Sequence, residues 1–421
     1  MRKYLFTFAA ILFIVTYIHA QPQRIGKTDV YWELIVEGGD TTIRFTGKGQ
    51  LEYDSWTKYR KNIKHVVIEE GISETCANAF SYCKNLTTVS LPQSMKIIGN
   101  NSFENCENIL QINLPSSLES IGSNAFYHTG GLPDSICLPN LYYIGKRTGE
   151  TFISASTFSF TYIKHVTIPY KIDTLFTNFY DCYKLSSVVI PATVKNFTGG
   201  TFFNDTALKL VVNLSPLPQT FEVPKGHYNA FYRVKRSQCR LIVPSSAVGL
   251  FKSTPVWEDF LIEGGGLSAG VTINDKTKGN IEGVEYRLYQ SGENVTWTAS
   301  PQKGCTFTGW RSNGEWLSTS PTLSFTITQD TIIEAVFEGE VAVPETDKKA
   351  EKVLLYPNPA HTQFTVQANS PIRSITVFDL SGRKVLETDN HTVNVSEIAK
   401  GIYMVEIQTA EGRHMKKFIR Q

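Results

Sequence analysis

The fold is decided by two adjacent stretches of the chain, NLTTVSLPQSMKIIGNNSFENC (residues 85–106) and NILQINLPSSLESIGSNAFYHT (residues 108–129), which repeat one pattern at an offset of 23 residues. Each copy has a short run in which apolar and polar residues alternate, then a proline, an Ile-Gly pair and a phenylalanine. The alternation is typical of a half-buried strand, and the proline ends the strand because it cannot donate to the hydrogen-bond ladder. One such unit cannot bury its own apolar face, so successive units must stack. The pattern predicts a mainly β solenoid whose strands form one continuous parallel sheet.

The period continues on both sides of these two copies. Phe80, Phe103 and Phe126 are 23 residues apart, and Phe179 and Phe202 repeat the same step. Residues 127–178 depart from the period, so the sequence does not fix the register of the repeats there. Each unit is expected to supply one strand, one proline stop and one turn.

The repeats resemble the BspA-like leucine-rich repeats of bacterial surface proteins over residues 26–263. The resemblance rests on Ala79-Phe80 with Cys83 and on Ser102-Phe103 with Cys106. Residues 28–55 resemble the β-rich N-terminal cap of that family, and residues 241–263 resemble its terminal cap. The resemblance implies an N-terminal β cap over residues 21–62 and a leucine-rich-repeat solenoid with its terminal cap over residues 63–263.

Residues 264–340 change to alternating runs separated by Gly, Pro and Ser, which predicts a small β module. This segment resembles the internalin B-repeat in its divergent form, through Phe307, Gly309, Trp310 and the closing Ala335-Val336-Phe337. A sugar-stacking platform is one interpretation of the module's tryptophans, and packing in the core is the commoner one. These tryptophans are Trp297, Trp310 and Trp316.

Residues 341–352 are charged and contain no aromatic residue, which is typical of a solvated linker. Residues 353–421 alternate again and predict a small antiparallel β-sandwich. This segment resembles the C-terminal sorting domain of type IX secretion cargo in the Bacteroidetes. The resemblance rests on four motifs in order, which are Tyr356-Pro357-Asn358-Pro359-Ala360, Asp379-Leu380-Ser381-Gly382-Arg383, Gly401-Ile402-Tyr403 and Lys416-Lys417-Phe418-Ile419. It implies that the type IX secretion machinery is a partner and that these residues, above all Tyr356, Pro357, Asn358, Pro359, Gly401, Tyr403, Lys416, Lys417 and Phe418, form the sorting motif.

Residues 1–20 combine Arg2 and Lys3 with an apolar stretch and the small residue Ala20, which is the pattern of a secretory signal peptide. The apolar stretch is shorter than the roughly 20 residues that span a bilayer. We therefore expect export, no transmembrane anchor after signal removal, and a final location at the cell surface, attached to the outer membrane, or in the medium.

Composition and motif content argue against several functional classes. The 41 Lys and Arg nearly balance the 39 Asp and Glu, so no global field exists to attract nucleic acid. No histidine lies in an HExxH pair or near a GxSxG elbow, and the chain contains no GxGxxG, phosphate-loop or EF-hand pattern and no CxxC pair that would favour structural zinc. We predict no enzyme, no cofactor and no metal site.

The predicted activity is binding, through the outward strand positions of the solenoid. A curved face of short polar side chains suits protein or glycan ligands on a host or bacterial surface. The family resemblance implies an adhesin, and the alternatives are carbohydrate capture and an undetected surface hydrolase. The predicted ligand-binding residues are His65, Val67, Thr88, Ser90, Gln111, Asn113, His165, Thr167, Ser187 and Val189.

Four sites match an Asp-Ser/Thr-apolar pattern that resembles the O-glycosylation acceptor of exported Bacteroidetes proteins. The same residues are also common in ordinary turns. The candidate acceptors are Ser135, Thr174, Thr206 and Thr331.

Overall fold

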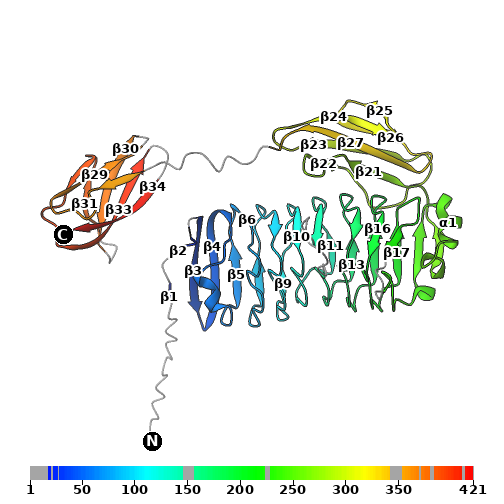
Figure 1. Ribbon diagram of the computed structural model, residues 1–421, viewed down its shortest axis with the longest axis horizontal. Helices are drawn as coiled ribbons and strands as arrows, with labels where there is room; N and C mark the ends of the chain where they lie inside the picture. The colour runs from blue at the N-terminus through cyan, green and yellow to red at the C-terminus, as the bar shows by residue number, and fades with distance from the viewer. Residues whose placement is uncertain are drawn as a thin grey trace, which may run out of the picture. The chain divides into compact units, whose positions relative to one another are not determined.

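The computed structural model describes residues 18–19, 22–26, 28–145, 156–222, 228–341, 353–368, 371–379, 384–409 and 413–420 of the 421-residue chain (Figure 1). The chain divides into two compact units, residues 1–341 and 342–421, and each is described by itself. Apart from residues 18, 19 and 341, the expected signal peptide (1–20) and linker (341–352) lie outside the described residues.

The first unit opens with antiparallel strands. β3 (Asp29–Glu37) pairs along its whole length with β4 (Asp40–Gln50), and the short β1 (Ile18–His19) and β2 (Gln23–Arg24) add to its other edge. A 3-10 helix, η1 (Ser55–Tyr59), follows. β4 then pairs in parallel with the first repeat strand, with Thr42 opposite His65, so the hairpin gives the solenoid its first template.

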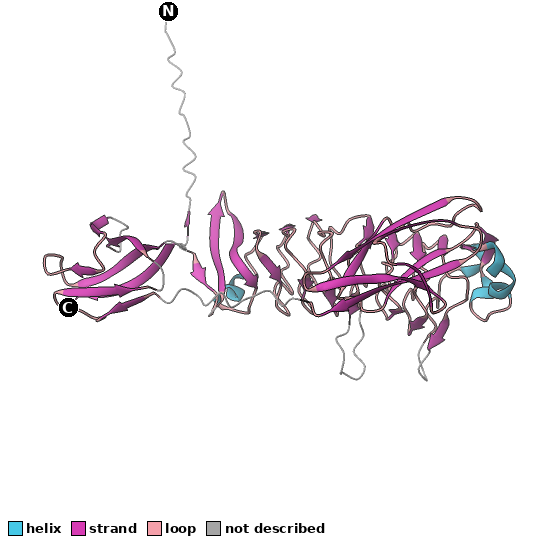
Figure 2. Cartoon of the chain, turned by 90° about the horizontal axis from the view of Figure 1, so that it is seen from above, coloured by secondary structure: helices cyan, strands magenta, loops and turns pink. Residues whose placement is uncertain are grey.

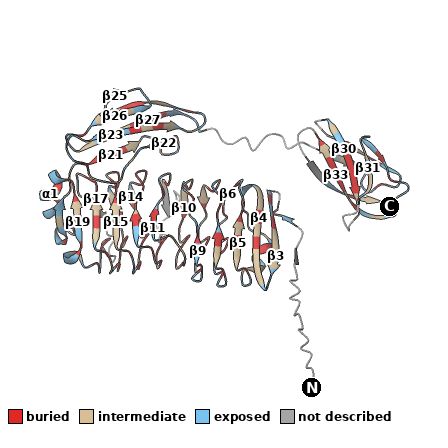
Figure 3. Ribbon diagram, turned by 180° about the vertical axis from the view of Figure 1, so that it is seen from behind, coloured by how far each residue is buried: buried red, intermediate tan, exposed pale blue. Residues whose placement is uncertain are grey.

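Each coil of the solenoid contributes one strand to a main face, and alternate residues of these strands are buried (Figure 3). The strands pair in parallel and in register, so that His65 lies opposite Thr88, and Thr88 lies opposite Gln111. The main-face strands are β5 (His65–Ile68), β7 (Thr88–Ser90), β9 (Gln111–Ile112), β11 (Ser135–Cys137), β13 (His165–Thr167), β15 (Ser187–Ile190), β17 (Leu210–Asn213), β19 (Arg240–Val243) and β20 (Leu261–Gly264).

Each of the coils from β5 to β17 also has a second short strand that the sequence did not predict. These strands are two or three residues long, which is too short for a visible alternation. They are β6 (Ile72–Glu74), β8 (Ile97–Ile98), β10 (Ser120–Gly122), β12 (Tyr143–Gly145), β14 (Thr174–Leu175), β16 (Asn196–Thr198) and β18 (Thr220–Glu222).

The prediction of one continuous parallel sheet is wrong. The main-face strands separate into two sheets between β9 and β11. At this point the backbone N–H of Ile112 donates to the carbonyl of Gly131, in a loop, at 3.2 Å. Gly131 has a φ of 64°, a left-handed conformation that interrupts an extended ladder. The break falls inside the stretch where the sequence loses its period.

The core of the solenoid is a column of phenylalanine rings, one from each coil, which we call the aromatic spine. Neighbouring rings lie 5.3–5.6 Å apart between centroids, with interplanar angles of 2–20°. The spine consists of Phe80, Phe103, Phe126, Phe158, Phe179, Phe202 and Phe231, each at most 1% exposed. Phe158 is therefore the spine residue within residues 127–178, where the sequence did not fix the register of the repeats.

A tryptophan closes the spine at each end. Trp56 from η1 lies 5.2 Å from Phe80, and Trp257 packs against Phe231 at 5.3 Å and 62°. Trp257 belongs to the terminal cap, which contains η2 (Arg236–Gln238), η3 (Ser245–Ala247), α1 (Val248–Lys252) and η4 (Trp257–Asp259) (Figure 2). Both tryptophans are fully buried, so neither end of the column exposes a ring face.

The β module consists of two small sheets packed around its own core. One sheet has the order β21 (Ala269–Ile273), β27 (Thr331–Gly339), β24 (Cys305–Ser312), β25 (Glu315–Ser318). The other has the order β22 (Gly279–Glu282), β23 (Asn294–Pro301), β26 (Thr322–Thr326). Only β21 and β27 pair in parallel.

The module packs directly on the solenoid through the residues that follow β13. The hydroxyl of Tyr170 accepts a hydrogen bond from the backbone N–H of Ile281 at 2.8 Å, and the Tyr170 ring joins the core of the module. Beside it, Nζ of Lys171 donates to Oδ1 of Asn280 at 2.5 Å and to the carbonyl of Lys276 at 3.1 Å. Burial lowers the pKa of Lys171 to about 8. The solenoid and the module are therefore one continuous packed unit.

The second unit is an antiparallel sandwich, as the sequence predicts. Its sheets have the orders β28 (Leu354–Tyr356), β29 (Gln363–Gln367), β32 (Thr392–Asn394) and β31 (Lys384–Thr388), β30 (Ile372–Phe378), β33 (Gly401–Thr409), β34 (Arg413–Arg420). The predicted fold class is confirmed: a mainly β chain with a leucine-rich-repeat solenoid, a small β module and a C-terminal antiparallel sandwich. No helix among the described residues is long and apolar enough to cross a membrane.

Replacing Phe126, in the middle of the spine, with alanine should lower the free energy of unfolding of the first unit by about 3–5 kcal/mol. The substitution removes a fully buried ring that stacks on Phe103 and Phe158. Chemical denaturation followed by circular dichroism measures the loss. The control is Leu110→Ala at a side chain that is 79% exposed, which should change stability by less than about 0.5 kcal/mol. Equal effects of the two substitutions would contradict the role of the spine.

Candidate ligand-binding face and sorting motif

The predicted ligand-binding residues face outward on the main-face strands, except Asn113, which follows β9. None of the ten has a buried side chain, while their strand neighbours, such as Val66, Val89 and Ile112, are buried in the core. The parallel register places them in two rows that cross the coils, because residues opposite each other point to the same side of a sheet. The break between β9 and β11 separates the rows into an N-terminal and a C-terminal group.

Lys64 and His65 form a hydrogen-bonded arrangement with the neighbouring strands. Nζ of Lys64 lies 2.6 Å from Oδ1 of Asp40, and this contact holds the pKa of the Asp40 carboxyl below its usual value. Nδ1 of His65 is hydrogen-bonded to Oγ1 of Thr88 at 2.7 Å, and its Nε2 lies 3.6 Å from Oδ2 of Asp40. The imidazole is thus held between the strand before it and the strand after it.

Part of this arrangement, the Lys–Asp pair and the His–hydroxyl hydrogen bond, recurs around Lys164 and His165. Nζ of Lys164 lies 2.7 Å from Oδ2 of Asp134, and Nδ1 of His165 is hydrogen-bonded to Oγ of Ser187 at 2.8 Å. β13 lies four main-face strands after β5, so the two histidines are roughly 20 Å apart at about 4.8 Å per strand. The face therefore presents a Lys–Asp pair beside a hydrogen-bonded histidine twice.

One predicted binding residue has a structural task. The side-chain amide of Asn113 donates to the carbonyl of Leu91 at 2.7 Å and accepts from the N–H of Leu91 at 2.8 Å. It thereby continues the ladder between two coils in place of a backbone group. Its polar atoms are already paired with the protein.

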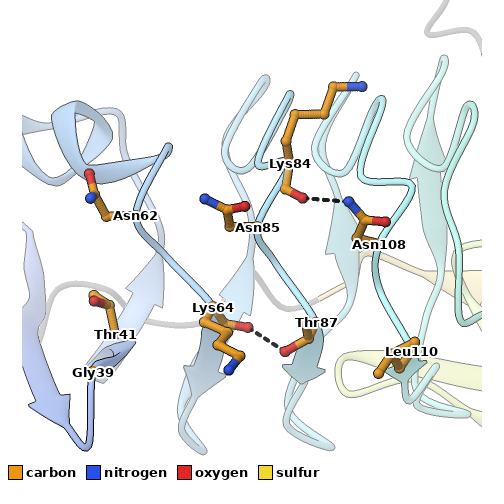
Figure 4. A pocket seen from close by; sticks show the side chains of 9 residues that line it. All are labelled: Gly39, Thr41, Asn62, Lys64, Lys84, Asn85, Thr87, Asn108 and Leu110. Carbon is orange, nitrogen blue, oxygen red and sulfur yellow. Dashed lines mark hydrogen bonds between the residues drawn. The ribbon is translucent and has the colours of Figure 1, made fainter.

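A polar hollow of about 620 Å³ lies at the start of β5, β7 and β9, beside Lys64 (Figure 4). Its amide and hydroxyl groups are fixed by bonds to the preceding coil: Asn108 donates to the carbonyl of Lys84 at 2.8 Å, and Thr87 donates to that of Lys64 at 3.0 Å. The lining consists of Gly39, Thr41, Asn62, Lys64, Lys84, Asn85, Thr87, Asn108 and Leu110.

Sequence reasoning missed the hollow and several charged residues of the face. Arg44, opposite Val67, pairs with Glu69 at 2.6 Å, and Arg240 pairs with Glu263 at 2.7 Å. The alternation of β4 and β19 is the signal that would have placed both arginines on the outer face. The hollow had no such signal, because its residues come from the β3–β4 hairpin and from the segments before β5, β7 and β9.

The described residues include no group of three or more His, Cys, Asp or Glu side chains that could hold a metal ion. The cysteines at the repeated position are buried, and burial raises the pKa of Cys83 to about 12 and raises those of Cys106 and Cys182 as well. Cys106 donates its thiol to the carbonyl of Phe80. These thiols are packing groups and poor nucleophiles.

In the second unit, the fold brings together motifs from opposite ends of the segment. The N–H of Ile419 donates to Oδ1 of Asn358 at 2.9 Å, and the N–H of Ala360 donates to the carbonyl of Ile419 at 3.0 Å. Phe418 is fully buried, 4.6 Å from Phe364 between ring centroids, and Tyr403 lies 6.5 Å from it.

The remaining predicted sorting residues lie around this contact. Tyr356, Pro357, Asn358 and Pro359 are exposed, Gly401 pairs with Arg420 across β33 and β34, and Lys416 is exposed. Lys417 lies in β34 opposite Met404. Of the motif at residues 379–383, only Asp379 is among the described residues.

Three family profiles match the chain. The BspA type leucine rich repeat region matches residues 54–150 and 148–222 in six copies, the divergent InlB B-repeat domain matches residues 269–340, and the secretion system C-terminal sorting domain matches residues 354–421. No curated protein gives a significant match.

Several solved structures are similar to the chain. A leucine rich repeat protein of T. pallidum is 24% identical over 49% of this chain and 89% of its own, with a TM-score of 0.33. A leucine-rich repeat protein of Bacteroides ovatus is 14% identical over 60% of this chain and 95% of its own, with a TM-score of 0.31. A leucine rich cell surface protein of Faecalibacterium prausnitzii is 16% identical over 58% and 94%, with a TM-score of 0.21.

The three profiles follow one another in the order in which the structure places the solenoid, the module and the sandwich. The sorting domain marks the chain for type IX secretion to the cell surface or the medium. The protein is therefore an exported BspA-type leucine-rich-repeat protein that carries a divergent InlB B-repeat domain and a secretion-system sorting domain.

Proposed function

We propose that this protein is an adhesin-like, non-enzymatic binding protein, whose solenoid face and adjoining hollow take up a protein or a glycan of a host or bacterial surface. The observation that carries the proposal is the duplicated Asp–Lys–His–hydroxyl arrangement on the outer face. Its groups are fixed before any ligand arrives, so binding would cost little ordering entropy. Two copies roughly 20 Å apart would also suit a repeating ligand or an extended protein surface.

We place the domain boundaries and the binding residues as the sequence suggested, with one change. The signal peptide is 1–20, the N-terminal cap 21–62, the solenoid with its terminal cap 63–263, the module 264–340, the linker 341–352 and the sorting domain 353–421. The ligand would contact His65, Val67, Thr88, Ser90, Gln111, His165, Thr167, Ser187 and Val189, with Asn113 supporting the strands.

In the first alternative, carbohydrate capture, the same surface would bind a sugar. The remaining alternative is an undetected hydrolase. Buried, poorly ionised thiols and dispersed histidines argue for binding over hydrolysis. Release of cleaved product from a bound ligand would favour the hydrolase.

Binding is tested with purified residues 21–340 on a glycan array and on immobilised host and bacterial surface proteins. The double substitution His65→Ala with His165→Ala should weaken binding at least about tenfold, or about 1.4 kcal/mol. The control is His128→Ala, at a partly exposed histidine on a turn outside the main-face strands. The affinity of this variant should stay within about twofold of that of the parent. Equal affinity of the double variant and the parent would show that the solenoid face is not the binding site. The array result separates glycan from protein ligands.

We also propose that the secretion machinery recognises the exposed Lys416 of β34. Deleting residues 416–421 should abolish surface display, but it also removes the buried Phe418. A second variant separates recognition from folding: Lys416→Glu changes an exposed side chain. It should leave the thermal unfolding of the sandwich unchanged and still reduce surface display, measured by protease accessibility on intact cells. Normal display of Lys416→Glu would show that the machinery does not recognise the charge of Lys416. Normal display of the deletion variant would show that residues 416–421 are not needed for sorting.

Export also makes the O-glycosylation candidates relevant, and their exposure ranks them. Ser135 and Thr206 are exposed, while Thr174 and Thr331 are partly buried. We expect modification first at Ser135 and Thr206. Intact mass of the protein from its native source should exceed the sequence mass after signal removal, and Ser135→Ala with Thr206→Ala should reduce the excess. A mass equal to the bare sequence would contradict the assignment.

A further inference from the structure

One tryptophan of the β module differs from every other tryptophan in the chain. Trp316 is 54% exposed, whereas the other five tryptophans are at most 2% exposed. The three tryptophans that the sequence grouped therefore separate: Trp297 and Trp310 form core, and Trp316 does not. Singly exposed apolar side chains are common on protein surfaces, so the support of the indole and the groups beside it decide whether it forms a site.

The indole is held on a rigid support. Trp316 lies in β25, the last strand of its sheet, after a two-residue Asn313-Gly314 turn in which both φ angles are positive, 51° and 87°. Its six-membered ring lies against Gly309 of the adjacent strand. A Cβ atom at position 309 would stand 2.9 Å from Cζ3 and 3.0 Å from Cε3 of the indole. The glycine therefore creates the space in which the ring rests.

A charged pair lies beside the indole on the same side of the sheet. Arg311 is opposite Trp316 in β25 and opposite Glu334 in β27, so the three side chains form one row across three strands. Nε of Arg311 donates to Oε2 of Glu334, and both side chains are partly exposed. This bond uses one of the five donors of the guanidinium, and the carboxylate retains further acceptor sites.

We propose that Trp316, Arg311 and Glu334 form a binding site for a neutral hexopyranose ring of a surface glycan. The apolar C–H face of the sugar would pack on the free part of the indole. Its hydroxyl groups would accept hydrogen bonds from the guanidinium and donate to the carboxylate. Because the two charges neutralise each other, the site favours a neutral sugar over a charged one. A single indole flanked by a charged pair is small for a protein interface, which needs about 800 Å² on each side.

This site is separate from the solenoid face and does not depend on the function proposed for that face. Failure of the histidine variants would leave it intact, and loss of the tryptophan would leave binding at the solenoid face intact.

Because Trp316 is the one exposed tryptophan of the six, the experiment has a specific fluorescence signal. Acrylamide quenching of tryptophan fluorescence in the full chain should report mainly this residue, since the other five are buried. We would titrate the protein with methyl glycosides of glucose, galactose and mannose, and with dextran and mannan. At least one probe should give a saturable change in emission and reduce acrylamide quenching at least about twofold.

Trp316→Ala removes the fluorescent reporter, so its binding is measured by isothermal titration calorimetry; the parent chain should give a saturable heat and the variant none, while circular dichroism stays that of the parent chain. Trp316→Tyr, which keeps an aromatic ring, should retain part of the binding, and Arg311→Gln should weaken it about tenfold. The matched control is Leu317→Ala, at the next residue of the same strand, which is 50% exposed. It should bind within about twofold of the parent. Absence of any saturable response, or an unchanged response in Trp316→Ala, would overturn the proposal.

Discussion

The solenoid depends on one constraint: no coil can cover both faces of its own phenylalanine. Each ring of the aromatic spine is buried only because the rings of the coils before and after it lie 5.3–5.6 Å away. The column therefore needs a distinct structure at each end. The chain supplies a tryptophan there, Trp56 in η1 and Trp257 in η4, and both pack on the terminal rings. The caps are as much a part of the core as the repeats between them.

The same stacking of the coils determines how polar side chains are arranged on the surface. Because coils repeat at the spacing of parallel strands, a side chain of one coil is within hydrogen-bond distance of the equivalent position in the next. His65 reaches Thr88 in this way, and His165 reaches Ser187. Asn108 and Cys106 use the same step to reach backbone carbonyl groups of the preceding coil. The polar groups of the candidate site are therefore oriented by the coils that form the core.

The sequence was sufficient to predict the features that repeat. The period of Phe80, Phe103 and Phe126 predicted the solenoid, and the alternation in residues 65–68 predicted which side chains face outward. The sequence could not predict features that arise where distant segments meet. The hollow beside Lys64 is built from the β3–β4 hairpin and from the segments before β5, β7 and β9, and the packing of Tyr170 on the module joins segments 111 residues apart. The different exposure of Trp310 and Trp316 depends on which strand lies at the sheet edge, and alternation alone does not determine this.

The contact between Tyr170 and Ile281 also has a consequence for the order in which the chain folds. Stacking one coil on the next closes a loop of 23 residues, whereas this contact closes a loop of 111 residues. The entropic cost of closing the larger loop is about 1.4 kcal/mol greater if both behave as flexible chains. Once the intervening coils have stacked, their rigidity removes most of that cost. We therefore expect the stacked coils to form first and the module to dock on them late in folding.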